Sequence, residues 1–236
     1  AVFDTAFHRT LPPRAYRYAV PESMYRDHGV RRYGFHGTSH AYVAQRAAEH
    51  LDRPLEELNL ITLHLGNGAS ATAIEKGESI DTSMGLSPLE GLVMGSRSGD
   101  IDPTIVFHLG RSAGLSNDEV ESMLNRQSGL LGLCGDVDLR EVQRRAVEGD
   151  AQAALALDVY GYRIKKYVGA YVAVLGSVDA IVFTGGVGEN QPDIRRRALD
   201  GMEGFGVAVD PDRNGAADPS TGPSNIDSEK SSAAVL

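Results

Sequence analysis

Two glycine-rich turns, each after a short apolar segment, have the residue types that bind phosphate groups. The first is Leu65-Gly66-Asn67-Gly68-Ala69, and the second spans Thr184 to Asn190. Glycine lets backbone N–H groups approach an anion without a Cβ atom in the way, and a following helix start adds a favourable dipole. Either turn alone would serve equally well as a simple chain reversal, so neither assigns a function by itself.

The motifs that most often bind nucleotides are absent from the sequence. No glycine is followed directly by lysine, which excludes a Walker A loop. The dinucleotide-binding pattern also fails, because Gln191 occupies the position of its third glycine. That failure and the presence of one cysteine, Cys134, argue against a redox enzyme. A nucleotide bound by this chain must therefore be held by another architecture.

Three clusters of polar residues add to the two turns. The segment Arg31–His40 brings together two histidines, two hydroxyl groups and two glycines, Arg97 lies among serines and glycines in 95–103, and Asp4 has apolar neighbours. An arginine flanked by small residues can approach a ligand closely, and its planar guanidinium group suits phosphate. A single histidine or arginine is more often structural, so the clusters are informative only together.

The apolar periodicity and the turn residues predict a mixed α/β sheet rather than an all-parallel one. Residues 9–33 are expected to be a loop because Pro12, Pro13 and Pro21 interrupt any long element. Residues 82–102 and 210–231 are also expected to be loops. The other expected elements are strands at 60–65, 69–75, 79–81, 179–183, 205–209 and 232–236, and helices at 39–51, 103–109, 116–125, 139–147, 151–175 and from 192.

Length and composition exclude several classes of protein. The 236 residues, 42% hydrophobic and 23% charged, fit a globular chain of about one large domain. The net charge of −9 argues against a dedicated nucleic-acid or membrane partner, although tyrosines and arginines interleave in 9–33. Cys134 has no internal disulfide partner, and no signal or membrane-spanning pattern is present, which predicts a cytoplasmic protein. Both ends lack the polar character of natural termini, so we expect a fragment.

Taken together, these segments resemble the acetate kinase family. The resemblance follows the same order along about residues 1–210. It rests on Phe3–His8, Arg31–His40, His64–Gly68, Asp81–Gly85, Pro88–Gly95, Arg97–Pro103 and Gly186–Asn190. It implies the actin/hexokinase-type ATPase fold, with a ribonuclease-H-like mixed sheet flanked by helices and an active site in the cleft between two lobes.

The resemblance also implies a domain assignment and a reaction. Residues 1–236 would form the C-terminal nucleotide-binding lobe, with 1–10 near the hinge and with the N-terminal lobe and the extreme C-terminus missing. The reaction would be direct in-line phosphoryl transfer between ATP and acetate, with Mg²⁺, giving acetyl phosphate and ADP. The family's metal-linked Asn and Glu would lie outside this chain, which is expected to be inactive alone. A homodimer is also implied.

Carried over residue by residue, the resemblance assigns roles to three groups of positions. The catalytic residues would be Asp4, His36 and Arg97, and Phe35 would contact the substrate. The nucleotide would be bound by His64, Leu65, Gly66, Asn67, Gly68, Asp138, Leu139, Arg140, Gly186, Val187, Gly188, Glu189 and Asn190. We expect the two turns to form one cradle for a triphosphate, with Arg97 and His36 over its outermost group.

The chemistry of the substrate constrains the role of Asp4. A carboxylic acid with a pKa of about 4 is already ionised at neutral pH, so acetate needs no general base. Catalysis must then come from alignment and from offsetting charge on the transferring phosphoryl group. We therefore expect Asp4 to have a positioning or magnesium-water role. Two alternatives remain: a propionate or butyrate kinase of the same family, and a non-catalytic nucleotide-binding fragment or interaction module.

Overall fold

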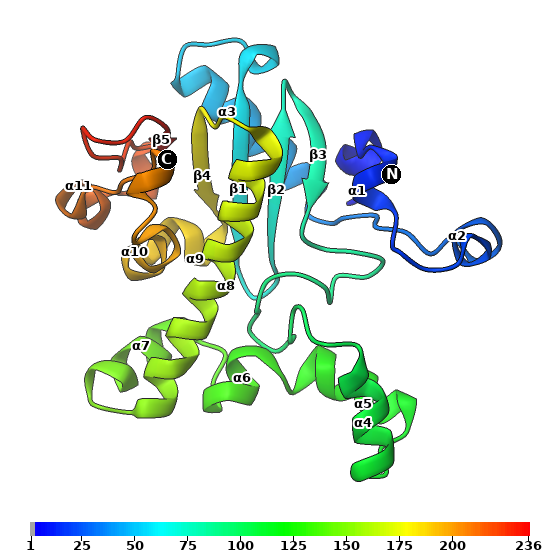
Figure 1. Ribbon diagram of the computed structural model, residues 1–236. Coiled ribbons are helices and arrows are strands. Elements are labelled where there is room, and N and C mark those ends of the chain that lie inside the picture. The colour runs from blue at the N-terminus through cyan, green and yellow to red at the C-terminus, as the bar shows by residue number, and fades with distance from the viewer. Residues whose placement is uncertain (1–2) are drawn as a thin grey trace.

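A five-stranded mixed sheet organises the chain in the computed structural model, which describes residues 3–236. The strands occur in the order β3-β2-β1-β4-β5 (Figure 1). β1 pairs antiparallel with β2 and parallel with β4, while β2–β3 is antiparallel and β4–β5 is parallel. The strand bounds are β1 Asn59–Leu65, β2 Ala69–Glu75, β3 Glu78–Thr82, β4 Ala180–Thr184 and β5 Ala234–Val235.

This strand order confirms the predicted ribonuclease-H-like sheet. Three consecutive strands form an antiparallel meander, and two later strands extend it in parallel after helical connections. The tight connection between β2 and β3 is made by Lys76 and Gly77, whose φ angles are +53° and +86°. Positive φ at both central residues is the geometry of a two-residue hairpin turn that matches the strand twist.

Helices cover both faces of the sheet. Alternate residues of a strand point to opposite faces. Ile61 and Leu63 belong to the core that includes the helix α8 (Ala151–Leu175), whereas Leu60 belongs to the smaller core beneath α3 (Gly37–His50). Figure 1 shows α8 crossing the sheet on one side, with α3 behind it. Every functional segment discussed below is anchored to one of these layers.

The remaining helices surround this centre. The capping box predicted at Ser116 and Glu119 is present at the start of α5, and the helices predicted at 139–147 and 151–175 have those bounds. The α-helices are α1 Pro13–Tyr16, α2 Glu22–His28, α4 Thr104–Ser112, α5 Asn117–Arg126, α6 Gly129–Cys134, α7 Leu139–Val147, α9 Gly185–Asn190, α10 Pro192–Leu199 and α11 Pro211–Ala216. Short 3-10 helices are η1 Ala6–Thr10, η2 Leu55–Glu57, η3 Glu203–Phe205 and η4 Pro219–Thr221.

Three predictions from the sequence are wrong. Residues 9–33 are not a plain loop: α1 begins at Pro13 and α2 directly follows Pro21, because proline fits the first turn of a helix. The strand expected at 205–209 does not form, since Gly206 has a φ of +76° and only Val209 makes a bridge, to Asp227. The loop expected at 210–231 contains α11 and η4.

Candidate phosphate-binding site

The two glycine turns meet at one edge of the sheet. β1 and β4 are parallel neighbours, with His64 opposite Thr184, so both turns follow the carboxyl ends of their strands. A Cβ atom added to Gly185, whose φ is +78°, would lie 2.6 Å from the carbonyl oxygen of Leu65. The turns are therefore in contact. In open α/β sheets, ligands bind outside the carboxyl ends of the strands.

His36 and Arg97 both lie close to Gly68 in the first turn. A Cβ atom at Gly68 would be 3.4 Å from Nε2 of His36 and 3.5 Å from a terminal nitrogen of Arg97. Three segments that are far apart in the sequence thus converge on one backbone position. An imidazole and a guanidinium group beside a glycine form a set of donors suited to an anion.

The backbone of the first turn has two available N–H groups. The Gly66 N–H donates to the carbonyl of Gly68 at 3.0 Å, and the Gly95 N–H donates to the carbonyl of Asn67 at 3.1 Å. Within residues 3–236 the N–H groups of Asn67 and Gly68 have no acceptor. Of the three residues assigned to the phosphates, Asn67 and Gly68 can therefore donate directly, whereas Gly66 shapes the turn.

Asp4 holds the backbone that presents His36. His36 immediately precedes α3 and has a φ of +56°, a conformation that few non-glycine residues adopt. Its N–H donates to Oδ2 of Asp4 at 2.9 Å, and the Gly37 N–H donates to the Asp4 carbonyl at 2.8 Å. Gly37 is required there, because a Cβ atom would lie 2.5 Å from that carbonyl oxygen. Asp4 therefore fixes the backbone at His36 and Gly37.

Four histidines, of which His8 and His40 are buried and His36 and His64 are half-buried, form a cluster next to the first turn. The rings of His36 and His64 stack at 4.2 Å, His40 meets His64 edge-on at 6.4 Å, and His8 meets His40 edge-on at 5.8 Å. Burial lowers the pKa of all four, and His64 and Arg97 further lower the pKa of His36, which falls to about 4. At neutral pH the cluster is uncharged.

This cluster predicts that stability falls on mild acidification. A histidine whose pKa is lower in the folded state than its usual 6.5 binds a proton more readily when unfolded. Its stabilising contribution is complete above pH 6.5 and is lost as the pH falls toward the folded value, about 4 for His36. One such group changes the free energy of unfolding by up to about 1.4 kcal/mol per pH unit.

The measurement is urea unfolding of the intact protein at intervals between pH 7.5 and pH 4.5. We expect the free energy of unfolding to decrease steadily below pH 6.5. In His40→Asn, which removes the most deeply buried imidazole of the cluster, the decrease should be shallower. A flat profile in the wild-type protein would contradict a neutral buried cluster.

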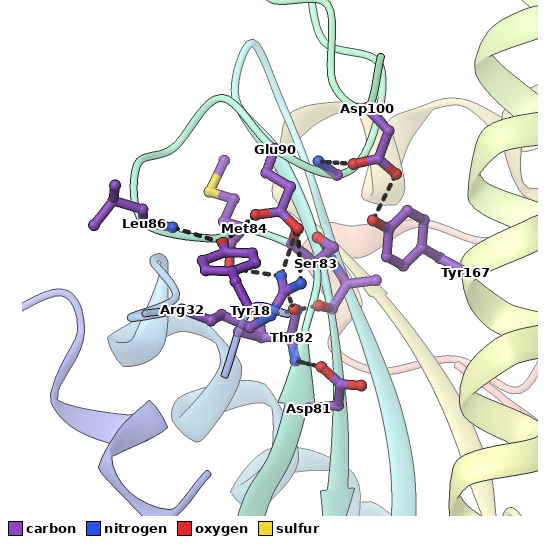
Figure 2. A network of polar contacts seen from close by, with 12 residues as sticks. Tyr18, Arg32, Asp81, Thr82, Ser83, Met84, Leu86, Glu90, Asp100 and Tyr167 are labelled. Carbon is purple, nitrogen blue, oxygen red and sulfur yellow. Dashed lines mark hydrogen bonds and ion pairs between the residues drawn. The ribbon is translucent and has the colours of Figure 1, made fainter. Parts of the chain in front are cut away.

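Asp100 closes the stretch of loop that contains Arg97. The Asp100 N–H donates to the Gly91 carbonyl at 3.0 Å, and the Gly91 N–H donates to Oδ1 of Asp100 at 2.8 Å. Figure 2 shows Tyr167, on α8, donating its hydroxyl proton to the other carboxylate oxygen at 2.7 Å. Residues 91–100 are thereby pinned at both ends and fixed to the longest helix.

Arg32 anchors the beginning of the same loop. Its guanidinium group donates to the carbonyl oxygens of Thr82, Ser83 and Met84 at 2.7, 3.1 and 3.2 Å, and pairs with Glu90 at 2.7 Å (Figure 2). The Tyr18 hydroxyl donates to the second oxygen of Glu90. Hydrogen bonds from a charged group are stronger than neutral ones. These anchors were not predicted from the sequence, in which the paired Arg31-Arg32 was the one signal for them.

The side chains of the second turn are engaged within their own helix. Oε1 of Glu189 accepts from the hydroxyl of Thr184 at 2.9 Å and from the N–H of Gly185 at 3.2 Å, and the Asn190 side chain donates to the carbonyl of Gly186 at 3.0 Å. A Cβ atom at Gly186 would meet nothing within 4 Å. The open part of this turn is therefore its backbone at Gly186.

The other residues assigned to ligands lie in different surroundings. Asp138 precedes α7 and accepts from the Arg140 N–H at 3.0 Å, while Leu139 is buried in the core. No hydrogen bond or ion pair in the described part of the chain joins Asp138–Arg140 to either turn. Phe35 is next to His36, and its carbonyl accepts from Nε2 of His8 at 2.9 Å.

A cavity beside the second turn does not include the cradle around Gly68. This cavity of about 280 Å³ lies between α3 and residues 217–226, and its lining includes Gly188 and Glu189 but neither His36 nor Arg97.

In residues 3–236 no group of three or more histidine, cysteine or acidic side chains is arranged to hold a metal ion. Over the same residues, no helix combines the length and apolarity needed to span a membrane.

Comparison with known proteins identifies the family. A sequence model described as the acetokinase family matches residues 1–236. The chain belongs to the acetokinase family. It is 60% identical, over 91% of its length, to an acetate kinase of Syntrophobacter fumaroxidans, of which it covers 52%. The chain thus spans about half the length of the curated relatives it matches.

Solved structures of an acetate kinase and a propionate kinase superpose closely on the chain. The acetate kinase of Porphyromonas gingivalis has a TM-score of 0.95 at 47% identity, covering 99% of this chain and 58% of that one. A propionate kinase from Francisella tularensis subsp. tularensis has a TM-score of 0.93 at 45% identity, covering 100% of this chain and 59% of that one. The fold of the acetokinase family is therefore the fold of this chain.

Proposed function

We propose that this chain is the C-terminal, nucleotide-binding lobe of a kinase that transfers a phosphoryl group between ATP and acetate, forming acetyl phosphate and ADP. The observation that supports it most directly is the convergence of His36 and Arg97 on Gly68, at the edge where both glycine turns meet. Membership of the acetokinase family supplies the reaction class.

In the proposed mechanism these residues bind, align and stabilise. Ionised acetate attacks the γ-phosphorus directly, and no proton needs to be removed from it. The N–H groups of Asn67 and Gly68 hold the phosphates, while His36 and Arg97 donate to the equatorial oxygens on which negative charge is spread in the transition state. Asp4 keeps His36 in its strained conformation.

The remaining assignments complete the ligand contacts. The backbone near Gly186 would contact adenosine and the α-phosphate, Asp138–Arg140 would face the adenine or ribose, and Phe35 would contact the carboxylate substrate. Mg²⁺ would offset charge on the phosphate oxygens. The described residues form no ligand set for that ion, so it is assigned to no side chain of this chain and to no step.

We extend the proposal to the setting of the enzyme. It would act in the cytoplasm as a homodimer, with no nucleic-acid or membrane partner. The net charge of −9 supports the absence of an anionic polymer as partner, and the buried free Cys134 is typical of a reducing compartment.

A second candidate substrate is propionate. The close superposition on a propionate kinase favours it specifically. A pocket distinguishes substrates that differ by one methylene group by only about 1–3 kcal/mol, and the residues described here do not enclose the acyl group.

A hydroxamate assay of the intact protein tests the proposal. The protein is incubated with ATP, MgCl₂ and acetate, propionate or butyrate, and hydroxylamine traps any acyl phosphate. We expect acetate to give the highest kcat/KM. A preference for propionate would select the second candidate. ADP binding without acyl phosphate from any carboxylate would show a non-catalytic nucleotide-binding protein and overturn the proposal.

A further inference from the structure

A continuous chain of hydrogen bonds leads from the centre of the sheet to His36. Nδ1 of His36 lies 2.8 Å from the hydroxyl oxygen of Ser70, which lies 2.7 Å from Nε2 of His40. Nδ1 of His40 lies 2.7 Å from the hydroxyl oxygen of Thr62. Thr62, Ser70 and His40 are fully buried, so no water competes for these contacts.

Thr62, at the far end of this series of hydrogen bonds, determines which atom donates and which accepts at each step. The Thr62 hydroxyl has one proton, and His40 is its hydrogen-bond partner in the described structure. If Thr62 donates to Nδ1 of His40, a neutral His40 carries its proton on Nε2 and donates it to Ser70. The Ser70 hydroxyl must then donate to Nδ1 of His36. His36 carries its remaining proton on Nε2, which lies 3.4 Å from a Cβ atom built on Gly68.

Every other arrangement leaves a buried proton without an acceptor. Reversing the direction leaves the Thr62 proton unpaired and directs a bare lone pair of His36 toward the phosphate cradle. While His40 keeps its proton on Nε2, a proton on Nδ1 of His36, whether in the other tautomer or in the imidazolium ion, leaves the Ser70 hydroxyl proton unpaired. Buried donors without acceptors are costly in folded proteins.

The ring of His8 is arranged in the same way, and there a backbone carbonyl determines which ring nitrogen carries the proton. Nε2 of His8 contacts the backbone carbonyl of Phe35 at 2.9 Å, and a carbonyl can only accept. Nε2 of His8 therefore carries the proton, and its Nδ1 accepts from the Ser79 hydroxyl at 2.8 Å. The cluster thus pairs serine hydroxyls with Nδ1 atoms and leaves protons on Nε2.

We propose that Thr62, His40 and Ser70 are positioning residues that hold His36 as the Nε2–H tautomer, so that its ring donates a hydrogen bond to the transferring phosphoryl group. The inference deepens the proposed function and rests on it for the identity of the acceptor. The arrangement of the protons rests on the hydrogen-bond geometry alone. Asp4, His64, Arg97 and His8 are the titratable neighbours of the His36 ring, and in the described structure none of them forms a hydrogen bond with its Nδ1.

The first experiment reads the tautomer directly. The intact protein is labelled with ¹⁵N-histidine, and long-range ¹H–¹⁵N correlation spectra at pH 7.5 distinguish protonated from unprotonated ring nitrogens. His36→Gln identifies the His36 signals. We expect Nε2 of His36 to be protonated and Nδ1 unprotonated. The opposite tautomer, or a mixture of the two in the wild-type protein, overturns the proposal without any variant having to fold.

The second experiment removes the hydroxyl proton of Thr62, which is at the opposite end of the hydrogen-bonded series from His36. Thr62→Val keeps the shape of the side chain but deletes the hydroxyl group, and Thr62→Ser restores it. We expect Thr62→Val to mix the His36 tautomers and to lower kcat roughly three- to tenfold at an unchanged KM for ATP, and Thr62→Ser to recover both. Thr72→Val is the matched control. Thr72 is equally buried, but its hydroxyl group bonds to that of Thr82 and is not part of the hydrogen-bonded series from Thr62 to His36.

The outcomes separate this inference from the proposed function. If the His36 tautomer is unchanged in Thr62→Val, then Thr62 does not set that tautomer and the inference is overturned, even if the protein is an active acetate kinase. A protein that makes no acyl phosphate but shows the Nε2–H tautomer overturns the proposed function and leaves the chain of hydrogen bonds in place.

Discussion

Replacing Arg97 with alanine is expected to lower kcat by at least about 100-fold while leaving the affinity for ADP near normal. The reason is that a preorganised donor aimed at developing charge stabilises the transition state by roughly 2.7–4 kcal/mol. Arg97 lies beside Gly68, next to His36, whereas the segments proposed to contact adenosine are in other elements. Steady-state kinetics and calorimetric titration with ADP measure the two quantities in the intact protein.

Two further variants make the result specific. Arg97→Lys keeps the charge but loses the planar guanidinium group, and should recover only part of the rate. Arg126→Ala removes an exposed arginine of α5 that makes no ion pair within residues 3–236, and should leave both quantities unchanged. Because Arg97 also donates to the Pro88 carbonyl at 3.1 Å, the thermal midpoint of each variant is measured. A kcat within a few-fold of wild type would remove Arg97 from the chemistry.

Gly68→Val is expected to weaken the binding of ATP itself by about tenfold or more. A Cβ atom at this position already contacts the ring of His36 and the guanidinium of Arg97 at 3.4 and 3.5 Å. The two extra methyl groups of valine would occupy the space between them, where the phosphates are proposed to bind. The φ of Gly68 is not in the left-handed region, so the substitution should not prevent folding.

The control for this prediction is a glycine far from the turn. Gly169 lies inside α8, and a Cβ atom there would meet nothing within 4 Å. Gly169→Ala should leave ATP affinity unchanged and stabilise the helix by up to about 1 kcal/mol. Calorimetric titration with ATP and ADP compares the two variants. Unchanged affinity in Gly68→Val would show that the first turn only reverses the chain.

Much of the fold was predictable because its signals are local. The sheet order follows from alternation in the first three strands, from the turn at Lys76-Gly77, and from the helical connection to β4. The errors arise where local signals are ambiguous. Prolines that were expected to break structure begin α1 and α2. Val207 and Ala208 are buried although no strand forms at 205–209, because Gly206 turns the chain.

The site was predictable in its backbone parts but not in its supporting contacts. The glycine turns, His36 and Arg97 belong to motifs that the sequence displays, and the structure brings them together. The links from Thr62 through Ser70 depend on the register that sets His64 opposite Ser70, and on the position of α3 above it. Alternating polar residues in β1 and β2 were the one available signal. They showed a polar sheet face without showing its partners.

The helix α8 has a consequence for how such a site can open and shut. It is 25 residues long, which corresponds to roughly 37 Å. It contacts α7 and α10 and, through Tyr167, the loop that contains Arg97. This helix therefore links the loop that contains Arg97 to α7, which begins within a segment proposed to contact adenosine. In the proposed kinase, we expect a nucleotide to enter and leave by hinge motion of these elements as one body relative to a second lobe, rather than by loosening of the loop.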